Sequence, residues 1–236
     1  MRLYLDTADR AAAEPLLATG LFSGLSTNPT ILRRFTEPAA CAAHGVETLG
    51  VRPGASALVL GAGPTGIFLA QLLAGNGASS VTVAAPERAK LATAAALGVD
   101  RTAPLDRTDP AGNTARLRAL SPTGDGYDIV VEASGATAVG NICVPLTRNG
   151  GTVLLYGVTG AQDTIAIHPY DVFRREITIE GSFAEMTSFG AAIAALSNGR
   201  VRTQGIITHR FGLDDYGKAL DALRSDPTVH KVVIVP

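Results

Sequence analysis

The run Gly61-Ala62-Gly63-Pro64-Thr65-Gly66 lies between a predicted strand and a predicted helix. In a strand-helix-strand unit, the first glycine permits a tight turn, the second lets the backbone approach a pyrophosphate, and the third lets the helix pack on the strand. The amides and the dipole at the helix N-terminus favour the pyrophosphate's negative charge. The complete strand-helix-strand setting favours a dinucleotide-binding turn over a turn with only a structural role.

Strands and helices alternate along most of the chain. This alternation predicts a parallel sheet covered by helices on both faces, and apolar runs such as 57–60 and 129–131 fit strands buried on both faces. We expect an α/β fold, a doubly wound Rossmann sheet over residues 35–236, preceded by a short β-α-β fragment over residues 1–34. The expected strands are 3–5, 22–26, 56–60, 81–84, 128–131, 152–156, 177–181, 206–210 and 231–235, and the expected helices are 10–18, 37–49, 65–73, 87–97, 113–120, 136–146, 188–197 and 214–224.

The second strand of a dinucleotide-binding unit normally ends in an acid that binds the ribose hydroxyls of NAD. Here Ala85 takes roughly that place, and the basic residues Arg88 and Lys90 follow it closely. Without the acid, a 2′-phosphate meets no repulsion, so the sequence favours NADP over NAD or predicts weak discrimination between them. The alternative is that Arg88 and Lys90 only form the solvated first turn of the next helix.

Charge and cysteine usage exclude several classes of protein. The chain has 236 residues with a formal net charge of −1, so no overall basic field attracts nucleic acid. No apolar run reaches about 18 residues, and we therefore expect no membrane-spanning helix. Cys41 and Cys143 lie far apart and the N-terminus lacks a secretory apolar stretch. We expect a cytoplasmic protein without a zinc-ribbon lobe or a disulfide framework.

Residues from about 37 to 236 resemble the cofactor half of the zinc-type medium-chain alcohol and polyol (sorbitol-like) dehydrogenases. The stretches GAGPTG, YDIVVEASG, GGTVLLYGV and EGSFAEMTSFGAAIAAL carry the resemblance. It implies NAD(P)-dependent hydride transfer to or from a small alcohol, polyol or sugar, and a homodimer. The cofactor-binding residues that it implies are Gly61, Gly63, Pro64, Thr65 and Gly66 at the pyrophosphate, and Ser134, Gly135, Tyr156, Gly157, Val158, Phe183 and Ala184 on the nicotinamide side.

The zinc-binding catalytic half of that family has no counterpart in this sequence. Glu37 alone remains, at a position where relatives place a glutamate beside the metal. Cys41 and His44 lie three residues apart on one predicted helix, but two groups without a third make a poor zinc site. We therefore expect no zinc from this chain alone, and weak or no activity in isolation. The alternative is a non-catalytic dinucleotide-binding module or a fusion remnant.

Residues 1–32 resemble a different family, the transaldolases and fructose-6-phosphate aldolases, which are (β/α)8 barrels that use a lysine Schiff base. Asp6 and Asn28 match the ends of that family's first two strands. All three lysines of the chain lie in the dehydrogenase-like part, so aldol chemistry has no nucleophile and we expect both residues to be remnants without a role. The two resemblances meet near residues 33–36, where we predict a fusion junction.

Overall fold

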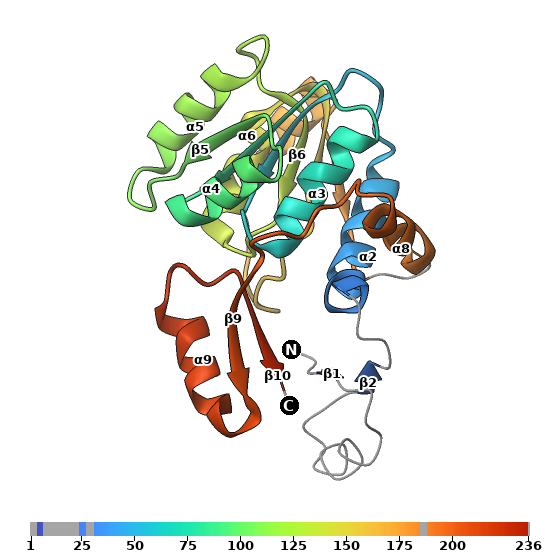
Figure 1. The fold of residues 1–236 in the computed structure, drawn as a ribbon. Helices are drawn as coiled ribbons and strands as arrows, with labels where there is room; N and C mark the ends of the chain where they lie inside the picture. Colours follow the sequence, from blue (N-terminus) through green and yellow to red (C-terminus); the bar gives the residue numbers. More distant parts are fainter. Residues whose placement is uncertain (1–3, 7–23, 27–30, 185–187, 236) are drawn as a thin grey trace.

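The computed structural model describes residues 4–6, 24–26, 31–184 and 188–235, with side chains from residue 37 onward. Its main body is a parallel sheet in the order β5-β4-β3-β6-β7-β8 with helices on both faces (Figure 1), which confirms the predicted α/β doubly wound fold. The strands of this sheet are β3 Ser56–Leu60, β4 Ser80–Ala85, β5 Arg101–Pro104, β6 Tyr127–Glu132, β7 Thr147–Leu155 and β8 Thr178–Gly181. The helices around it are α2 Ile31–Leu49, α3 Pro64–Gly75, α4 Arg88–Ala96, α5 Pro110–Leu120, α6 Thr137–Leu146, α7 Pro169–Arg175 and α8 Phe189–Ser197.

Alternate residues of the central strand β3 enter two separate apolar cores. Ala57 and Val59 belong to the core formed with α2, α3, α4 and α8, on one face of the sheet. Leu58 and Leu60 belong to the core formed with α5 and α6, on the opposite face. All four side chains are fully buried. A strand covered on both faces needs apolar residues at every position, which is why the continuous apolar runs predict the central strands correctly.

Two elements were not predicted. β5 is a short edge strand whose residues are mostly exposed, so no apolar run marks it. α7 begins at Pro169 and has no buried residue, so it lacks an apolar face. α2 begins at Ile31, and the predicted junction at residues 33–36 therefore lies inside a helix.

Residues 207–235 form a smaller strand-helix-strand unit outside the main sheet (Figure 1). β9, Ile207–Gly212, and β10, Lys231–Val235, pair in parallel. They are connected by a short 3-10 helix, Leu213–Asp215, and by α9, Tyr216–Ser225. The predicted terminal strands and helix are thus present, but the two strands form a sheet of their own and do not join the main sheet.

β1, Tyr4–Asp6, and β2, Gly24–Ser26, pair in parallel, and β1 lies beside β10. The predicted helix 10–18 lies outside the described residues, as do Asn28 and the side chain of Asp6. The predicted β-α-β fragment, and its likeness to a transaldolase, therefore stay predictions.

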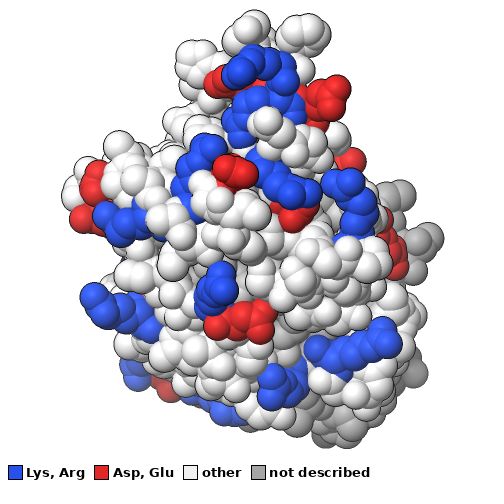
Figure 2. Space-filling view, turned by 90° about the horizontal axis from the view of Figure 1, so that it is seen from above, with Lys and Arg blue, Asp and Glu red and all other residues white. Residues whose placement is uncertain are grey.

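The described part of the chain contains no helix with the length and apolar character needed to cross a bilayer. On the face shown in Figure 2, basic and acidic side chains are interspersed and do not separate into patches of one sign.

The strand order reverses between β3 and β6. From β3 the chain continues to β4 and β5 on one side, and from β6 it continues to β7 and β8 on the other. The loops after the carboxyl ends of β3 and β6 therefore diverge and leave a crevice, which is where open α/β sheets bind ligands.

Candidate functional site

The loop between β3 and α3 has the geometry that its three glycines predict. Gly61 has a φ of +136°, and a Cβ added there would lie 2.8 Å from the carbonyl oxygen of Ala133. A Cβ at Gly66 would overlap the carbonyl oxygen of Gly61. A Cβ at Gly63, in contrast, would meet no atom within 4 Å. Gly61 and Gly66 are therefore required by the packing of the turn, whereas Gly63 leaves open space.

The N-terminus of α3 follows this open position. Gly63 is the N-cap residue and provides no side-chain hydrogen bond, and Pro64 begins the helix. The amides of Thr65 and Gly66 lie in the first turn, where a helix offers no internal acceptor. Such amides, together with the positive end of the helix dipole, bind anions such as phosphates. The arrangement fits a pyrophosphate.

A cavity of about 530 Å³ adjoins this loop, within the range of roughly 300–1,000 Å³ that is typical of small-molecule sites. Gly61, Gly63, Lys90 and Ser134 all line it, so the fold brings together predicted residues from three separate segments. The other walls come from the ends of β4 and β6, the loop after β5, and the helices α5 and α6.

Four charged residues line the cavity near the end of β4. Glu87, the N-cap residue of α4, forms an ion pair with Arg107. Asp106 accepts hydrogen bonds from the amide and the hydroxyl of Thr108 at 2.8 and 2.6 Å, and these bonds lower its pKa. No acid among the described residues forms an ion pair with Lys90. One acid is thus neutralised, the other is engaged within its own loop, and Lys90 contributes a cation to the wall.

Of the three residues predicted at the ribose, the structure places only Lys90 in the cavity wall. Ala85 is buried at the end of β4, where its carbonyl accepts from the amide of Leu105. Lys90 lines the cavity, whereas Arg88 is exposed and lies outside its wall. Sequence reasoning missed Glu87 and Arg107. Arg107 follows the unpredicted strand β5, so no signal in the sequence pointed to it.

The loops after β6 and β7 meet around a buried carboxylate that sequence reasoning also missed. Glu132, the last residue of β6, accepts hydrogen bonds from the amides of Ser134 and Gly135. Its backbone carbonyl accepts from the amide of Gly157 at 2.8 Å. Ser134, Gly135 and Gly157, all predicted on the nicotinamide side, are therefore brought together. An acid at the end of a buried strand was the available signal.

Tyr156 lies between these loops and α2. A Cβ added at Gly45 of α2 would lie 3.2 Å from the Tyr156 ring. Burial raises the pKa of the Tyr156 phenol, and the nearby Cys41 and Glu37 raise it further, while the hydroxyl of Thr65 opposes this shift. The phenol is therefore protonated at neutral pH. The remaining predicted residues on this side, Val158, Phe183 and Ala184, are exposed and do not line the cavity.

A family model described as zinc-binding dehydrogenase matches residues 64–198, more than half of the chain. This chain belongs to the zinc-binding dehydrogenase family. The match runs from the N-terminus of α3 to the end of α8, and so it includes the cavity walls that come from β4, the loops after β5 and β6, and α6, but not Gly61 and Gly63.

Among zinc-binding dehydrogenases and their relatives, the chain is 40% identical to D-arabinitol dehydrogenase 1 of Uromyces fabae over 201 residues, covering 85% of this chain and 57% of that protein. It is 31% identical to D-altritol 5-dehydrogenase of Agrobacterium fabrum, over 89% of this chain and 60% of that protein. A zinc-binding dehydrogenase structure from Sinorhizobium meliloti, bound to NADP, superimposes with a TM-score of 0.76 at 28% identity. The superposition covers 89% of this chain and 60% of that one. The chain thus spans less than two thirds of the length of these relatives.

The family name implies zinc, and the residues can be tested for it. A catalytic zinc site needs three protein ligands of the N, S or O type and an open position. Glu37 is exposed on α2, with Cys41 one turn further along. Within residues 37–184 and 188–235, no three His, Cys, Asp or Glu side chains are placed to hold a metal ion. The described residues therefore do not fit a catalytic zinc.

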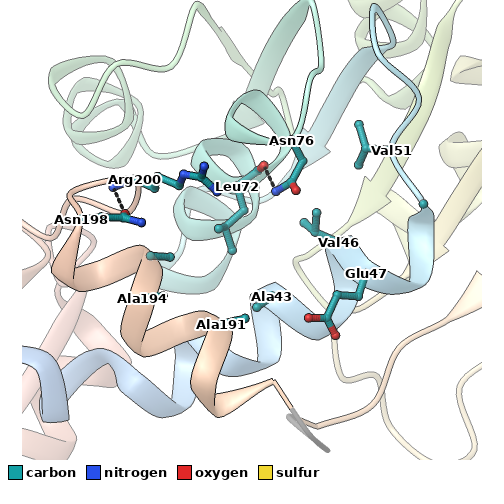
Figure 3. Close-up of a pocket in the computed structure, with 12 residues that line it drawn as sticks. Ala43, Val46, Glu47, Val51, Leu72, Asn76, Ala191, Ala194, Asn198 and Arg200 are labelled. Atoms are coloured by element: carbon teal, nitrogen blue, oxygen red, sulfur yellow. Dashed lines mark hydrogen bonds between the residues drawn. The ribbon is translucent and has the colours of Figure 1, made fainter.

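A second cavity, of about 400 Å³, lies between α2, α3 and α8 (Figure 3). Alanines form much of its wall, and Glu47 and Arg200 are the charged residues among the described side chains that line it. The hydroxyl of Ser188 donates to Glu47 at 3.0 Å. None of the predicted site residues lines this cavity, and its chemistry does not identify a ligand.

Proposed function

We propose that the chain binds a nicotinamide dinucleotide and serves an oxidoreductase of the alcohol and polyol dehydrogenase type. The observation that carries this proposal is the open Gly63 turn, which leads into the N-terminus of α3 beside a cavity at the point where the strand order reverses. The curated relatives named above are polyol dehydrogenases, which supports a small alcohol, polyol or sugar as the substrate class.

In this proposal the chain's own residues hold the cofactor. The amides of Thr65 and Gly66 bind the pyrophosphate, the cavity beside Lys90 takes the adenosine half, and the loops around Glu132 support the nicotinamide half. When bound, the nicotinamide ring exchanges a hydride with the substrate carbon. The protonated phenol of Tyr156 and the hydroxyl of Thr65 lie at the boundary between the phosphate and nicotinamide regions, where they orient the cofactor.

We propose that NADP is preferred over NAD. Ala85 places no carboxylate at the end of β4, Glu87 is paired with Arg107, and Lys90 faces the cavity. A 2′-phosphate would therefore meet Lys90 and the Arg107 guanidinium, while the remaining carboxylate of the wall, Asp106, is charged but hydrogen-bonded to Thr108. The preference rests on these residues of the chain; the structural relative with NADP bound shows only that a related fold takes this cofactor.

Turnover by this chain alone is proposed to be weak. The described residues supply no ligand set for zinc, so polarisation of an alcohol oxygen would need groups from elsewhere. The alcohol must lose its proton for hydride transfer to occur, and without such groups the alkoxide that forms is not stabilised. A non-catalytic dinucleotide-binding module is the second candidate function, and the same missing ligand set favours it.

Three further expectations stay predictions: a homodimer, a location in the cytoplasm, and a transaldolase-like origin of residues 1–32. Trapping with borohydride in the presence of a sugar phosphate tests the separate expectation that the chain has no transaldolase-like activity. A covalent adduct would show that one of the three lysines acts as a Schiff-base nucleophile after all.

Titration of the purified protein with NADPH and with NADH, followed by nicotinamide fluorescence, tests the proposed function. We expect micromolar binding that is tighter for NADPH. The chain contains no tryptophan, so protein fluorescence contributes little to the signal. Absence of binding to either cofactor, in protein shown to be folded by circular dichroism, would overturn the proposal. Binding without turnover on alcohols, polyols and sugars would favour the non-catalytic module.

A further inference from the structure

Glu132 has an unusual environment for a carboxylate. It ends the central strand β6 and is only 3% exposed. Its Oε1 accepts from the Ser134 amide at 2.8 Å, the Ser134 hydroxyl at 2.5 Å and the Gly135 amide at 3.0 Å, and its Oε2 lies 3.1 Å from the same Gly135 amide. No ion pair in the described part of the chain includes it. A buried carboxylate without a cation needs such donors, so this one is held entirely by the loop that it organises.

The loop after β7 closes on the same carboxylate. A Cβ at Gly157 would overlap Glu132 Oε2 and the Gly135 amide, and a Cβ at Gly135, where φ is +73°, would overlap the carbonyl oxygen of Val158. The Tyr156 and Gly157 amides both donate to the Glu132 backbone carbonyl, at 3.0 and 2.8 Å. Residues 133–135 and 156–158 therefore form one compact surface, with the Glu132 carboxylate between them.

We propose that Glu132 is a positioning residue, which locks the loops after β6 and β7 into the surface that receives the nicotinamide half of the cofactor. The inference rests on the proposed function, because it needs a dinucleotide at this site. It assigns the two halves of the cofactor to different determinants. The adenosine half depends on the cavity beside Lys90, and the nicotinamide half depends on the charge of Glu132.

The substitution Glu132→Gln tests the charge while keeping the shape. A carboxylate offers two acceptor oxygens, whereas an amide offers one acceptor oxygen and a donating NH2 group. In the variant, the amide oxygen can take the place of Oε1 and keep all three donors, which leaves the NH2 group at the Oε2 position facing the Gly135 N–H. This donor–donor contact, together with weaker bonds to an uncharged acceptor, loosens the loop. Lys90 and Arg107 form no hydrogen bond or ion pair with Glu132, so we expect their part of the cavity wall to stay in place, whereas Ser134, which also lines the cavity, belongs to the loosened loop.

Asp128→Asn is a matched control on the same strand. Asp128 lies near the opposite end of β6, where its Oδ2 accepts from the amide and the hydroxyl of Ser56, both at 2.8 Å, and its Oδ1 lies 2.5 Å from Arg148. It is thus a largely buried carboxylate that, like Glu132, accepts from an amide and a serine hydroxyl, but unlike Glu132 it also pairs with an arginine. It is remote from the predicted cofactor loops. Both variants are expected to lose stability, and only Glu132→Gln is expected to change the binding of the nicotinamide half.

The experiment compares calorimetric titrations of NADPH and of 2′,5′-ADP, which lacks the nicotinamide half, for the full chain and both variants. We expect Glu132→Gln to weaken NADPH binding at least tenfold and to change 2′,5′-ADP binding less than twofold. Asp128→Asn should change both less than twofold. If Glu132→Gln binds NADPH within twofold of the original chain, or weakens both ligands equally, the positioning role is wrong while the proposed function stands.

A second variant keeps the test decisive if Glu132→Gln does not fold. Gly157→Ala forces a methyl group between the carboxylate and the Gly135 amide and should show the same selective loss for NADPH. Equal loss of both ligands in this variant contradicts the proposal. If the original chain binds neither NADPH nor 2′,5′-ADP, it is the proposed function that fails, and this inference falls with it.

Discussion

Gly63 is the residue at which a single methyl group separates folding from cofactor binding. Its φ of −70° and ψ of 174° suit alanine, and an added Cβ meets no atom within 4 Å. We predict that Gly63→Ala folds normally but weakens NADPH binding at least tenfold, about 1.4 kcal/mol, because the methyl group occupies the space proposed for the pyrophosphate. Gly75→Ala is the control, since this glycine of the same helix also has open space around it. Equal affinity of the two variants in a fluorescence titration would contradict the assignment of the turn.

Lys90 and Arg88 allow the preference for NADP to be tested within one helix. Lys90 lines the cavity and Arg88 does not. A charge-assisted hydrogen bond contributes about 1.5–3 kcal/mol, so we predict that Lys90→Gln weakens NADPH binding about tenfold and leaves NADH binding nearly unchanged. Arg88→Gln should change neither. If the Arg88 variant shows the larger loss, the basic residues of α4 have been assigned the wrong way round.

The residues that sequence alone could identify are those with a local geometric requirement. Gly61 and Gly66 have such a requirement, and the spacing reveals it. Arg107 follows an unpredicted strand and pairs with Glu87, 20 residues away, so no spacing marks it. Glu132 bonds the nearby Ser134 and Gly135, and its place at the end of a predicted strand was a signal that the prediction did not use. Arg88 shows the opposite failure, because a basic residue near the right position lies outside the cavity.

At the scale of elements, the Tyr127 hydroxyl connects β6 to α5. The side chain is fully buried, and its hydroxyl donates to the carbonyl of Leu117 at 3.0 Å. Tyr127→Phe removes the donor and leaves that carbonyl without this partner, so we predict a loss of about 1 kcal/mol in the free energy of unfolding. Urea denaturation measures it, with Tyr170→Phe as the control, since Tyr170 is 69% exposed. A loss no larger than that of the control would show that the bond contributes no net stability.

The stability of the β9–α9–β10 unit depends on pH through the carboxyl of Asp226. Asp226 accepts hydrogen bonds from the hydroxyl and the amide of Thr228 at 2.6 and 2.7 Å, which lower its pKa, with a smaller effect from His209. A carboxyl whose folded pKa lies below its ordinary value of 3.8 stabilises the fold fully above that value. This stabilisation is lost as the pH falls through the folded pKa.

We therefore predict that Asp226→Asn is less stable than the original chain at neutral pH. The difference between the two should narrow as the pH falls below 3.8. Thermal unfolding midpoints measured across the acidic range test this expectation. A difference that stays constant with pH would show that the charge of Asp226 has no part in it.

Elements with strong burial patterns were the predictable ones. β3, β6 and β7 contain continuous apolar runs because both of their faces are covered. β5 and α7 lack such runs, and both are largely exposed. The separate sheet of β9 and β10 was beyond sequence reasoning for another reason. An alternating pattern of strands and helices identifies parallel strands but does not say which strands pair with which.

At the scale of the whole molecule, β8 is an edge of the main sheet, and the segments that flank β7 and β8 expose large apolar side chains. β8 has only β7 as a neighbour among the described strands. Phe183 directly follows β8 and is 85% exposed, Val158 follows β7 and is 89% exposed, and Phe173 on α7 is 80% exposed. Single exposed apolar residues are ordinary, but several near one unpaired strand are typical of an interface.

We predict that two copies of the chain associate through this edge. Sedimentation velocity at micromolar concentrations should show a dimer, and Phe183→Ser should weaken the association at least tenfold because it removes a large apolar side chain from the contact. Leu223→Ser is the control, since Leu223 is partly exposed on α9 in the separate C-terminal unit. A monomer at every concentration would refute the dimer. A dimer weakened equally by both substitutions would place the interface away from β8, and the open edge of the sheet would then need a different partner.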